Sequence, residues 1–402
     1  MFKREQVMKQ IRAAMDMPVI KIITGIRRCG KSSLLRLLRN ELLEKGVPEA
    51  NILLLDFESL SLVEYREAMA LYRYVEEWQK PLQGKVCLLF DEIQEVREWE
   101  KVIRSFSVDF ACDIVLTGSN ANLLSRDLAT HLAGRYVEFE LLPLSFSEYL
   151  TFHASSEKAK DVEQVFSTYL MEGGFPGLAL MRDQTDLKIQ YLKGIYHTVV
   201  MKDVIQRNAI RDAELLERVF AYLMENVGQI FSAKRIADYL KSQGRSSSLD
   251  AIYGYIHALE QGMVLYAAKR YDVKGRKVLD RMDKYFLADV GLRYALMGHR
   301  AGDIGQILEN VVYLELRRRG YQVFVGAQAG KEVDFIAVRQ EERMYVQVAY
   351  LLASPETVER EFSVLSGIAD HYPKWVLSMD NVPIGGREGI QWRNVIDFLL
   401  ER

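Results

Sequence analysis

The pattern G-x-x-x-x-G-K-[ST] is matched in full by a run of consecutive residues, Gly25-Ile26-Arg27-Arg28-Cys29-Gly30-Lys31-Ser32. An apolar run that predicts a strand ends at Thr24, and a helical pattern begins at Lys31. Glycines let the backbone bend until successive N–H groups converge on a phosphate, and a helix N-terminus adds a partial positive charge there. We therefore predict a nucleotide site in which Lys31 reaches the β- and γ-phosphates, the Ser32 hydroxyl holds Mg²⁺ and Ser33 lies near the α-phosphate.

A second apolar run, Val86–Phe90, ends in two carboxylates, Asp91 and Glu92. On a strand that follows a phosphate loop, the first acid lies beside Mg²⁺ and the second can polarise an attacking water. We predict these roles for Asp91 and Glu92, which together with Lys31 would make the site catalytic. A surface position between a strand and a helix is the alternative for Glu92.

Polar residues follow the next expected strand, Ile114–Thr117. In ATPases of this build, the strand between the phosphate loop and the acidic strand carries a polar residue that faces the γ-phosphate. Ser119 and Asn120 are the candidates for this sensor position, and an ordinary turn is the alternative.

Several arginines are candidates for neutralising charge in a transition state. We expect Arg135 or Arg126 to act as an arginine finger, in its own subunit or in a neighbouring one. Arg27 and Arg28 inside the phosphate loop are further candidates. For each of them, an ordinary surface or ion-pair role is the alternative.

The elements that must position these residues alternate between short apolar runs and helical patterns, which is typical of a parallel α/β sheet. We predict such a P-loop ATPase sheet, an AAA-like domain, over residues 1–145. Its expected strands are Val19–Thr24, Ile52–Phe57, Val86–Phe90, Ile114–Thr117 and Tyr136–Leu142.

The middle of the chain is predicted to be helical at first and then to form a winged helix. Residues 146–205 are expected to be a helical linker or lid, interrupted by a turn at 173–177. Residues 206–286 have a helix-helix-helix-hairpin pattern, in which Ser247 and Asp250 predict a capping box for a helix over Leu249–Gln261. The expected hairpin strands are Met263–Tyr271 and Lys277–Phe286.

Charge on this winged-helix pattern is uneven. The helix over Ser248–Gln261 contains no Lys or Arg, which argues against strong reading of a DNA groove. The hairpin is basic and could follow DNA phosphates, whereas a solvated hairpin packed against its neighbours is the alternative. Its basic residues are Lys269, Arg270, Lys274, Arg276 and Lys277.

The element order over residues 287–402 is helix-strand-strand-strand-helix-strand, which matches the core of restriction-endonuclease-like domains. Active nucleases of this fold bind a metal with an acid on the first helix, an Asp at a strand start and Glu-x-Lys on the next strand. Glu309 and Asp334 occupy the first two positions, whereas Gln347 and Ala349 stand where Glu and Lys are needed. A neutral amide and a missing ammonium predict a degenerate nuclease-type site.

Substitutes for the missing groups are Glu332 or a displaced lysine such as Lys331. We expect the domain to be kept for binding or assembly rather than for cleavage. The alternative is a working, metal-dependent nuclease.

The segments Thr24–Ser33, Leu89–Gln94, Leu116–Asn120 and 133–136 together resemble archaeal and bacterial AAA-type ATPases that carry a C-terminal domain of unknown function. Gly174-Phe175-Pro176 and Glu332-Val333-Asp334-Phe335 fit the same family, and the likeness extends over about residues 4 to 400. It implies an ATP-binding AAA-like domain, a winged helix and a nuclease-fold tail. It implies no substrate, because the physiological role of the family is unassigned.

Composition and charge exclude several classes of protein. The chain has 402 residues, of which 49% are hydrophobic and 27% charged, with a net charge of −2. These values exclude a disordered chain and a wholly basic nucleic-acid coat protein. Three scattered cysteines do not support a disulfide framework or a Cys-rich zinc site. No apolar run approaches the ~20 residues of a membrane helix, so we expect a cytoplasmic protein without a membrane partner.

The sequence as a whole predicts a switch protein that binds ATP with Mg²⁺ and hydrolyses it. One alternative is a nucleic-acid-binding ATPase with residual nuclease activity, and another is a scaffold that binds nucleotide without hydrolysing it. DNA, a protein partner and a second copy of the chain are the expected partners besides ATP.

Overall fold

The computed structural model describes residues 4–119, 132, 134–154, 161–181, 184–275, 277–328 and 330–401. The chain forms two compact units, Met1–Leu141 and Leu142–Arg402. The boundary expected after residue 145 lies close to this division. Those expected after residues 205 and 286 lie inside the second unit.

A five-stranded sheet forms the centre of the first unit, with strand order β2-β3-β4-β1-β5. All neighbouring strands are parallel, which confirms the predicted parallel α/β sheet. The strands are β1 (Ile20–Thr24), β2 (Ile52–Asp56), β3 (Val86–Asp91), β4 (Cys112–Gly118) and β5 (Tyr136–Glu140).

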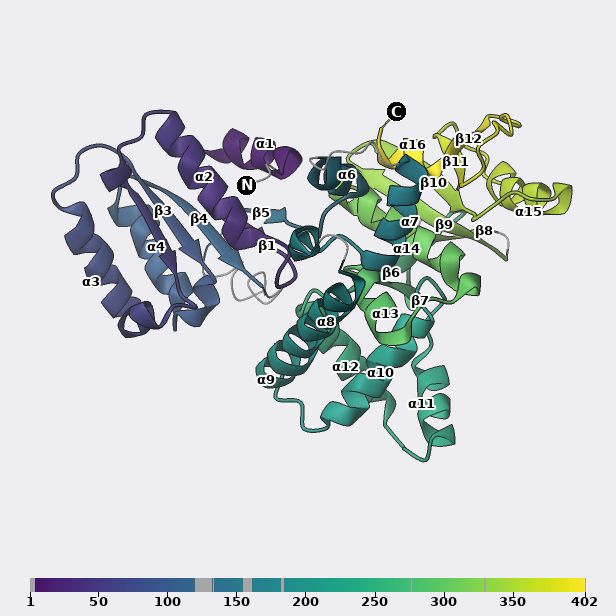
Figure 1. Cartoon of the computed structure of the whole chain (residues 1–402), viewed down its shortest axis with the longest axis horizontal. Coiled ribbons are helices and arrows are strands. Elements are labelled where there is room, and N and C mark those ends of the chain that lie inside the picture. Colours follow the sequence, from purple (N-terminus) through teal and green to yellow (C-terminus); the bar gives the residue numbers. More distant parts are fainter. Residues whose placement is uncertain are drawn as a thin grey trace. The chain divides into compact units, whose positions relative to one another are not determined.

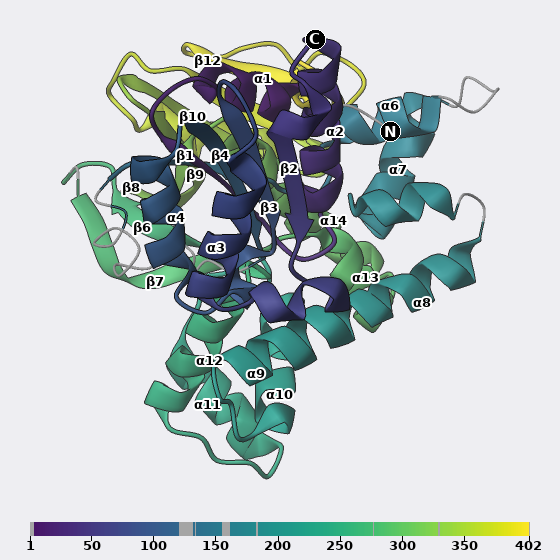
Figure 2. The same cartoon turned by 90° about the vertical axis from the view of Figure 1, so that its left-hand side faces the viewer.

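Helices cover both faces of this sheet, because strands such as β1 and β3 are buried along their whole length. Figures 1 and 2 show α2 on one face and α3 with α4 on the other. Arg12 of α1 pairs with Glu41 of α2 at 2.9 Å and so holds these two helices together. The helices are α1 (Glu5–Ala14), α2 (Lys31–Glu44), α3 (Ala68–Gln79) and α4 (Trp99–Asp109), with short 3₁₀ turns at Glu49–Asn51, Leu60–Tyr65 and Ile93–Glu95.

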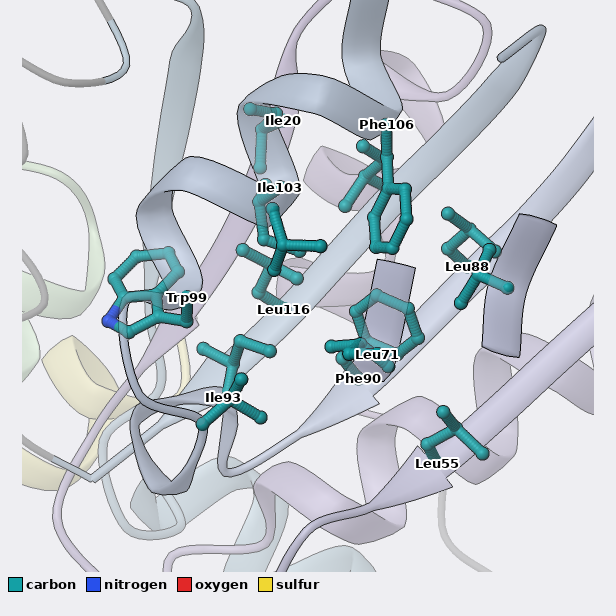
Figure 3. Packing of buried hydrophobic residues seen from close by; sticks show 14 of the residues in the cluster. Ile20, Leu55, Leu71, Leu88, Phe90, Ile93, Trp99, Ile103, Phe106 and Leu116 are labelled. Carbon is teal, nitrogen blue, oxygen red and sulfur yellow. The ribbon is translucent and has the colours of Figure 1, made fainter. Parts of the chain in front are cut away.

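An apolar core lies between the sheet and the helices α3 and α4 (Figure 3). Leu88 and Phe90 of β3 belong to this core together because alternate residues of a strand share one face. Leu71 from α3 and Phe106 from α4 pack against them, and all four side chains are buried. Burial of a side chain of this size contributes about 1.5–3 kcal/mol, so the packing holds the strand ends in fixed positions.

The carboxyl ends of the parallel strands meet at one edge of the sheet. Thr24, Asp91 and Gly118 end β1, β3 and β4 there. β4 lies between β1 and β3, and Asp56 at the end of β2 is in register with Asp91. The segments that follow β1, β3 and β4 therefore lie side by side.

Helices make up the first half of the second unit. Ser232 and Ser248 cap α11 and α12 by accepting hydrogen bonds from backbone N–H groups three residues later. The capping residue of α12 is thus Ser248, and the expectation for Ser247 was wrong by one position. The helices are α6 (Phe146–Ala154), α7 (Val162–Glu172), α8 (Thr185–Tyr196), a π-helical segment (His197–Val204), α9 (Ile205–Arg207), α10 (Ala213–Glu225), α11 (Ala233–Ser242), α12 (Leu249–Gln261) and α13 (Val290–Met297), with a 3₁₀ turn at Pro176–Leu180.

A seven-stranded mixed sheet, with order β12-β11-β10-β9-β8-β6-β7, organises the rest of the second unit. The hairpin β6–β7 joins this sheet because residues 270–272 of β6 pair in parallel with residues 325–327 of β8. The hairpin and the C-terminal α/β region therefore share one sheet (Figure 1). The strands are β6 (Leu265–Asp272), β7 (Lys277–Leu287), β8 (Gln322–Gln328), β9 (Lys331–Arg339), β10 (Glu342–Val348), β11 (Lys374–Ser378) and β12 (Ile390–Asn394).

Three helices complete this region: α14 (Ile304–Arg318), α15 (Pro355–Ser366) and α16 (Val395–Leu399), after a 3₁₀ turn at Ala301–Asp303. The order α14, β8, β9, β10, α15, β11 agrees with the order expected from the sequence, whereas α13, β12 and α16 were not expected. Within the described ranges, no helix combines the length and apolar character needed to cross a membrane.

Candidate functional site

The loop that follows β1 can be made only with glycine at its first position. Gly25 has a φ of +153°, and a Cβ on it would lie 2.2 Å from the carbonyl oxygen of Leu141. The chain is this close because the N–H of Leu141 donates to the carbonyl of Thr24 at 2.7 Å. Gly30, with a φ of +108°, forms the N-cap of α2 and turns the loop into the helix.

Lys31 begins α2 and is buried, with 3% of its surface exposed. Its ammonium donates to the carbonyl oxygens of Gly25 at 3.0 Å and Ile26 at 3.4 Å. It also lies 3.4 Å from a carboxylate oxygen of Glu92. The ammonium thus points back into the loop, where the N-terminal N–H groups of a helix favour an anion.

Ser32 and Asp91 are in direct contact through a hydrogen bond between their side chains. Burial raises the pKa of Asp91, and the hydrogen bonds from Ser32 and Thr117 partly offset this effect. A hydroxyl and a carboxylate oxygen are hard ligands of the type that Mg²⁺ prefers. The two residues predicted to hold Mg²⁺ are therefore adjacent, and their donor atoms fit this ion.

Glu92 follows β3 in a left-handed backbone conformation, with a φ of +50°. Its carboxylate accepts hydrogen bonds from the Ser119 hydroxyl at 2.9 Å and from the Gln94 amide. Burial alone would raise the pKa of Glu92, but the charge of Lys31 and these hydrogen bonds hold it below its usual value. Glu92 is therefore ionised at neutral pH and buried rather than on the surface.

Thr117, near the end of β4, connects the two acids and was not predicted as a site residue. Its hydroxyl donates to Asp91 and accepts from the backbone N–H of Glu92 at 3.0 Å. Thr117 is fully buried. The sequence indicated Ser119 and Asn120 after this strand, but it gave no sign that a threonine before the turn would align both carboxylates.

The structure also describes the three loop residues Arg27, Arg28 and Cys29. Arg27 forms an ion pair with Glu58, which follows β2. Burial of Glu58 raises its pKa, and the charge of Arg27 opposes this effect. Cys29 is buried, which raises the pKa of its thiol, and Arg28 adopts a positive φ of +72°.

Arg135 lies at the amino-terminal end of the strands, opposite the end that carries the phosphate loop. It precedes β5, and its carbonyl accepts a hydrogen bond from Ile20 at the start of β1. The length of a strand therefore separates it from the phosphate loop of its own chain, and the expectation that Arg135 acts there within one subunit is wrong. It lines a cavity of about 440 Å³ with Lys85 and Cys112. Action on a neighbouring subunit stays a prediction, and Arg126 and Asn120 lie outside the described residues.

The second unit brings together the acids of the predicted nuclease-type site. Glu309 on α14 and Glu332 and Asp334 on β9 surround the ammonium of Lys284 on β7, at 3.4, 2.5 and 3.9 Å respectively. Burial raises the pKa values of Glu309 and Asp334, and the positive charge of Lys284 opposes this effect. Lys331, the lysine considered as a substitute, instead donates to Ser363 at 3.0 Å.

Gln347 also lies at this cluster. Its carbonyl oxygen accepts from the backbone N–H of Asp334 at 3.2 Å, and its amide donates to Glu361 at 2.9 Å. The N–H of Val348 donates to Asp334 at 2.8 Å. In the part of the chain that the structure covers, no group of three or more His, Cys, Asp or Glu is arranged to hold a metal ion.

The basic hairpin is present, with its tip shaped by Asp272. The carboxylate of Asp272 accepts from the N–H groups of Lys274 and Gly275 at 3.1 and 3.0 Å. Lys269, Lys274 and Lys277 are exposed and Arg270 is half-buried, whereas Arg276 lies outside the described residues.

Comparison with known protein families gives two matches. An AAA domain matches residues 18–150, which contain the loop, Asp91 and Glu92. A domain of unknown function (DUF8612) matches residues 163–303. The second match extends across the boundary expected after residue 205 and over the hairpin.

Relatives match over most of the chain. An uncharacterized protein of Haemophilus influenzae is 38% identical over 401 residues, which are 100% of this chain and 99% of that protein. An uncharacterized protein of Methanocaldococcus jannaschii is 29% identical over 385 residues, covering 90% of this chain and 80% of the relative. Neither has an assigned function that could be transferred.

Among solved structures, a Walker-type ATPase of Pyrococcus abyssi has a similar fold, with a TM-score of 0.53 and 18% sequence identity. The match covers 74% of this chain and 96% of the other. It supports a P-loop ATPase fold.

Proposed function

Because this chain belongs to the same family as the Haemophilus influenzae protein and carries an AAA domain, we propose that it is a switch protein that binds and hydrolyses ATP. The observation that carries this proposal is the convergence of Lys31, Ser32, Asp91 and Glu92 at one edge of the sheet. These residues supply an ammonium, a Mg²⁺ ligand pair and an ionised carboxylate, which are the groups that phosphoryl transfer to water requires.

Each residue has a separate task in this proposal. Mg²⁺, when bound, offsets charge on the phosphates, and the Ser32 hydroxyl and the Asp91 carboxylate would hold it. Lys31 exchanges its loop carbonyls for phosphate oxygens, because an ammonium binds charged oxygens more strongly than neutral ones. Glu92, released from Lys31, orients the attacking water, and Ser119 keeps the carboxylate in place.

Phosphate release by the full chain tests the proposal. Glu92→Gln should lower the rate by roughly 10²- to 10⁴-fold while ATP binding is retained, because only the group that orients water is lost. Glu95→Gln, an exposed acid three residues away, is the matched control and should hydrolyse ATP like the wild type. A wild-type rate no higher than that of Glu92→Gln would leave only the scaffold that binds nucleotide without hydrolysis.

We also propose finer fold assignments for the second unit. The order α10, α11, α12, β6, β7 supports a winged helix, and the order α14, β8, β9, β10, α15, β11 supports a restriction-endonuclease-like region. The shared sheet indicates that these two regions are packed as one body rather than as separate domains.

Binding of duplex DNA by the hairpin is a second candidate function, supported by the exposed Lys269, Lys274 and Lys277. Changing Lys274 and Lys277 to Glu should weaken DNA binding and reduce its salt dependence, because fewer counterions are released. Changing the exposed Lys80 and Lys101 to Glu alters the net charge equally and is the control. Equal losses in both double variants would exclude a specific role for the hairpin.

A further inference from the structure

Lys284 is the centre of the acid cluster in the second unit. It is buried, with 3% of its surface exposed, although it comes from the basic hairpin. Its ammonium lies within 4 Å of Glu309, Glu332 and Asp334. These acids come from a helix and a strand that follow the hairpin in sequence, so the cluster forms only when the hairpin packs on α14 and β9.

The base of the hairpin is fixed in the position that this cluster needs. Phe286, two residues after Lys284 and therefore on the same face of β7, stacks on Tyr313 with ring centroids 4.2 Å apart. The side chain of Asn310 accepts from the N–H of Leu287 at 2.8 Å and donates to its carbonyl at 2.9 Å. These contacts direct Lys284 between α14 and β9.

The other groups at the nuclease-type positions are already hydrogen-bonded within the protein. Asp334 accepts from the N–H of Val348 with one oxygen and faces Lys284 with the other. Gln347 uses its carbonyl oxygen for Asp334 and its amide for Glu361. An amide rather than an acid is required at position 347, because a carboxylate would not donate a hydrogen bond to Glu361.

A metal ion and this ammonium would compete for the same oxygens. Mg²⁺ needs oxygen ligands at about 2.0–2.1 Å in a near-octahedral arrangement. Here the carboxylate oxygens surround a nitrogen atom at 2.5 to 3.9 Å, which are ion-pair distances. A second cation could enter only if Lys284 moved out of a closely packed site.

We infer that Lys284 is the permanent cation of this cluster and takes the place that a divalent metal ion holds in nucleases of similar fold. The site is therefore closed to metal-dependent cleavage. Its task is to attach the basic hairpin to the C-terminal sheet. This inference is independent of the ATP site in the first unit.

Thermal unfolding of the full chain tests the attachment. Lys284→Met should lower the unfolding midpoint of the second unit, because it leaves the buried Asp334 and the partly buried Glu309 and Glu332 without their cation. Adding Glu309→Gln and Glu332→Gln to Lys284→Met should restore part of the loss, because these changes remove negative charge that no longer has a cation. Lys331→Met removes a nearby exposed lysine and should leave the midpoint unchanged. Equal midpoints for Lys284→Met and Lys331→Met would overturn the inference.

Binding of Mn²⁺ to the nucleotide-free chain, followed by electron paramagnetic resonance, gives a second test that does not require the Lys284 variant to fold. An Asp91→Asn background removes Mn²⁺ binding at the ATP site. In this background we expect no Mn²⁺ site that disappears with Asp334→Asn. Such a site, or Mn²⁺-dependent DNA cleavage lost in Asp334→Asn, would overturn the inference.

Discussion

Lys31 and Lys284 are buried to the same extent, yet their surroundings differ in what they allow. Lys31 contacts two neutral carbonyl oxygens and one carboxylate, next to a helix N-terminus that favours anions. Lys284 contacts three carboxylates. A lysine held mostly by neutral acceptors can exchange them for phosphate oxygens, whereas a lysine among carboxylates already has its counterions. Burial of a lysine therefore does not by itself indicate a binding site, whereas the charge of the groups around it does.

Replacing Lys284 or Lys31 by Met should change different properties of the protein, stability in the first case and ATP affinity in the second. Lys284→Met should destabilise the second unit by roughly 3–5 kcal/mol, the usual cost of breaking a buried ion pair, and leave ATP affinity unchanged. Urea unfolding combined with ATP titration measures both quantities. A loss of ATP affinity in Lys284→Met would show that the two sites are not independent.

Lys31→Met should act mainly on ATP affinity rather than on stability. Loss of a charged hydrogen bond to phosphate costs roughly 1.5–3 kcal/mol, so ATP affinity should fall by about ten- to a hundredfold. The stability of the nucleotide-free protein should fall by less than in Lys284→Met, because Glu92 loses its ion-pair partner but keeps its hydrogen bonds from Ser119 and Gln94. Calorimetry and thermal unfolding of the same preparation check both statements, and a large loss of stability without a loss of affinity would reverse the assignment.

Thr117 tests how the two acids of the ATP site are held in position. Thr117→Val keeps the shape but removes the hydroxyl that joins Asp91 to the N–H of Glu92, so it should cost roughly 1–3 kcal/mol of stability and lower ATP hydrolysis. Thr117→Ser keeps the hydroxyl and is the matched variant, which should hydrolyse ATP at a rate close to that of the wild type. Equal rates for the two variants would mean that the hydroxyl does not position the acids.

A pH-dependent effect concerns Asp289, a buried acid that two backbone N–H groups, of Gly174 and Gly291, hold instead of a lysine. Burial raises its pKa from 3.8 to about 7. Between these values the folded chain keeps a proton that the unfolded chain releases, so this residue makes the free energy of unfolding fall as pH rises. In Asp289→Asn this part of the pH dependence should disappear. An identical pH dependence in both proteins would contradict the shift.

The phosphate loop and its acids were predictable because the information is local. One contiguous segment contains Gly25, Gly30, Lys31 and Ser32. Asp91 ends an apolar strand, and a parallel sheet brings the end of that strand to the same edge as this segment. Lys284 was not predictable, because its position depends on how a hairpin packs against a helix and a strand that come later in the chain.

The positions of two further residues relative to the ATP site became clear only from the pairing of the strands. Arg135 precedes its strand, and only the pairing of β5 with β1 shows that it lies at the edge away from the loop. The strand that ends in Thr117 was expected to lie beside the acidic strand, but only the observed register shows that Thr117 itself lies beside Asp91. Contiguous motifs were therefore predictable, whereas partners across strands required the fold.

Calorimetric titration of the full chain with ATP and Mg²⁺ tests whether Lys31, Ser32, Asp91 and Glu92 form an ATP site. We expect binding heat at one site, which is lost or strongly reduced in Lys31→Met and weakened in Asp91→Asn when Mg²⁺ is present. Absence of heat from a folded wild-type protein, or undiminished binding in Lys31→Met, would contradict the claim that these residues form an ATP site.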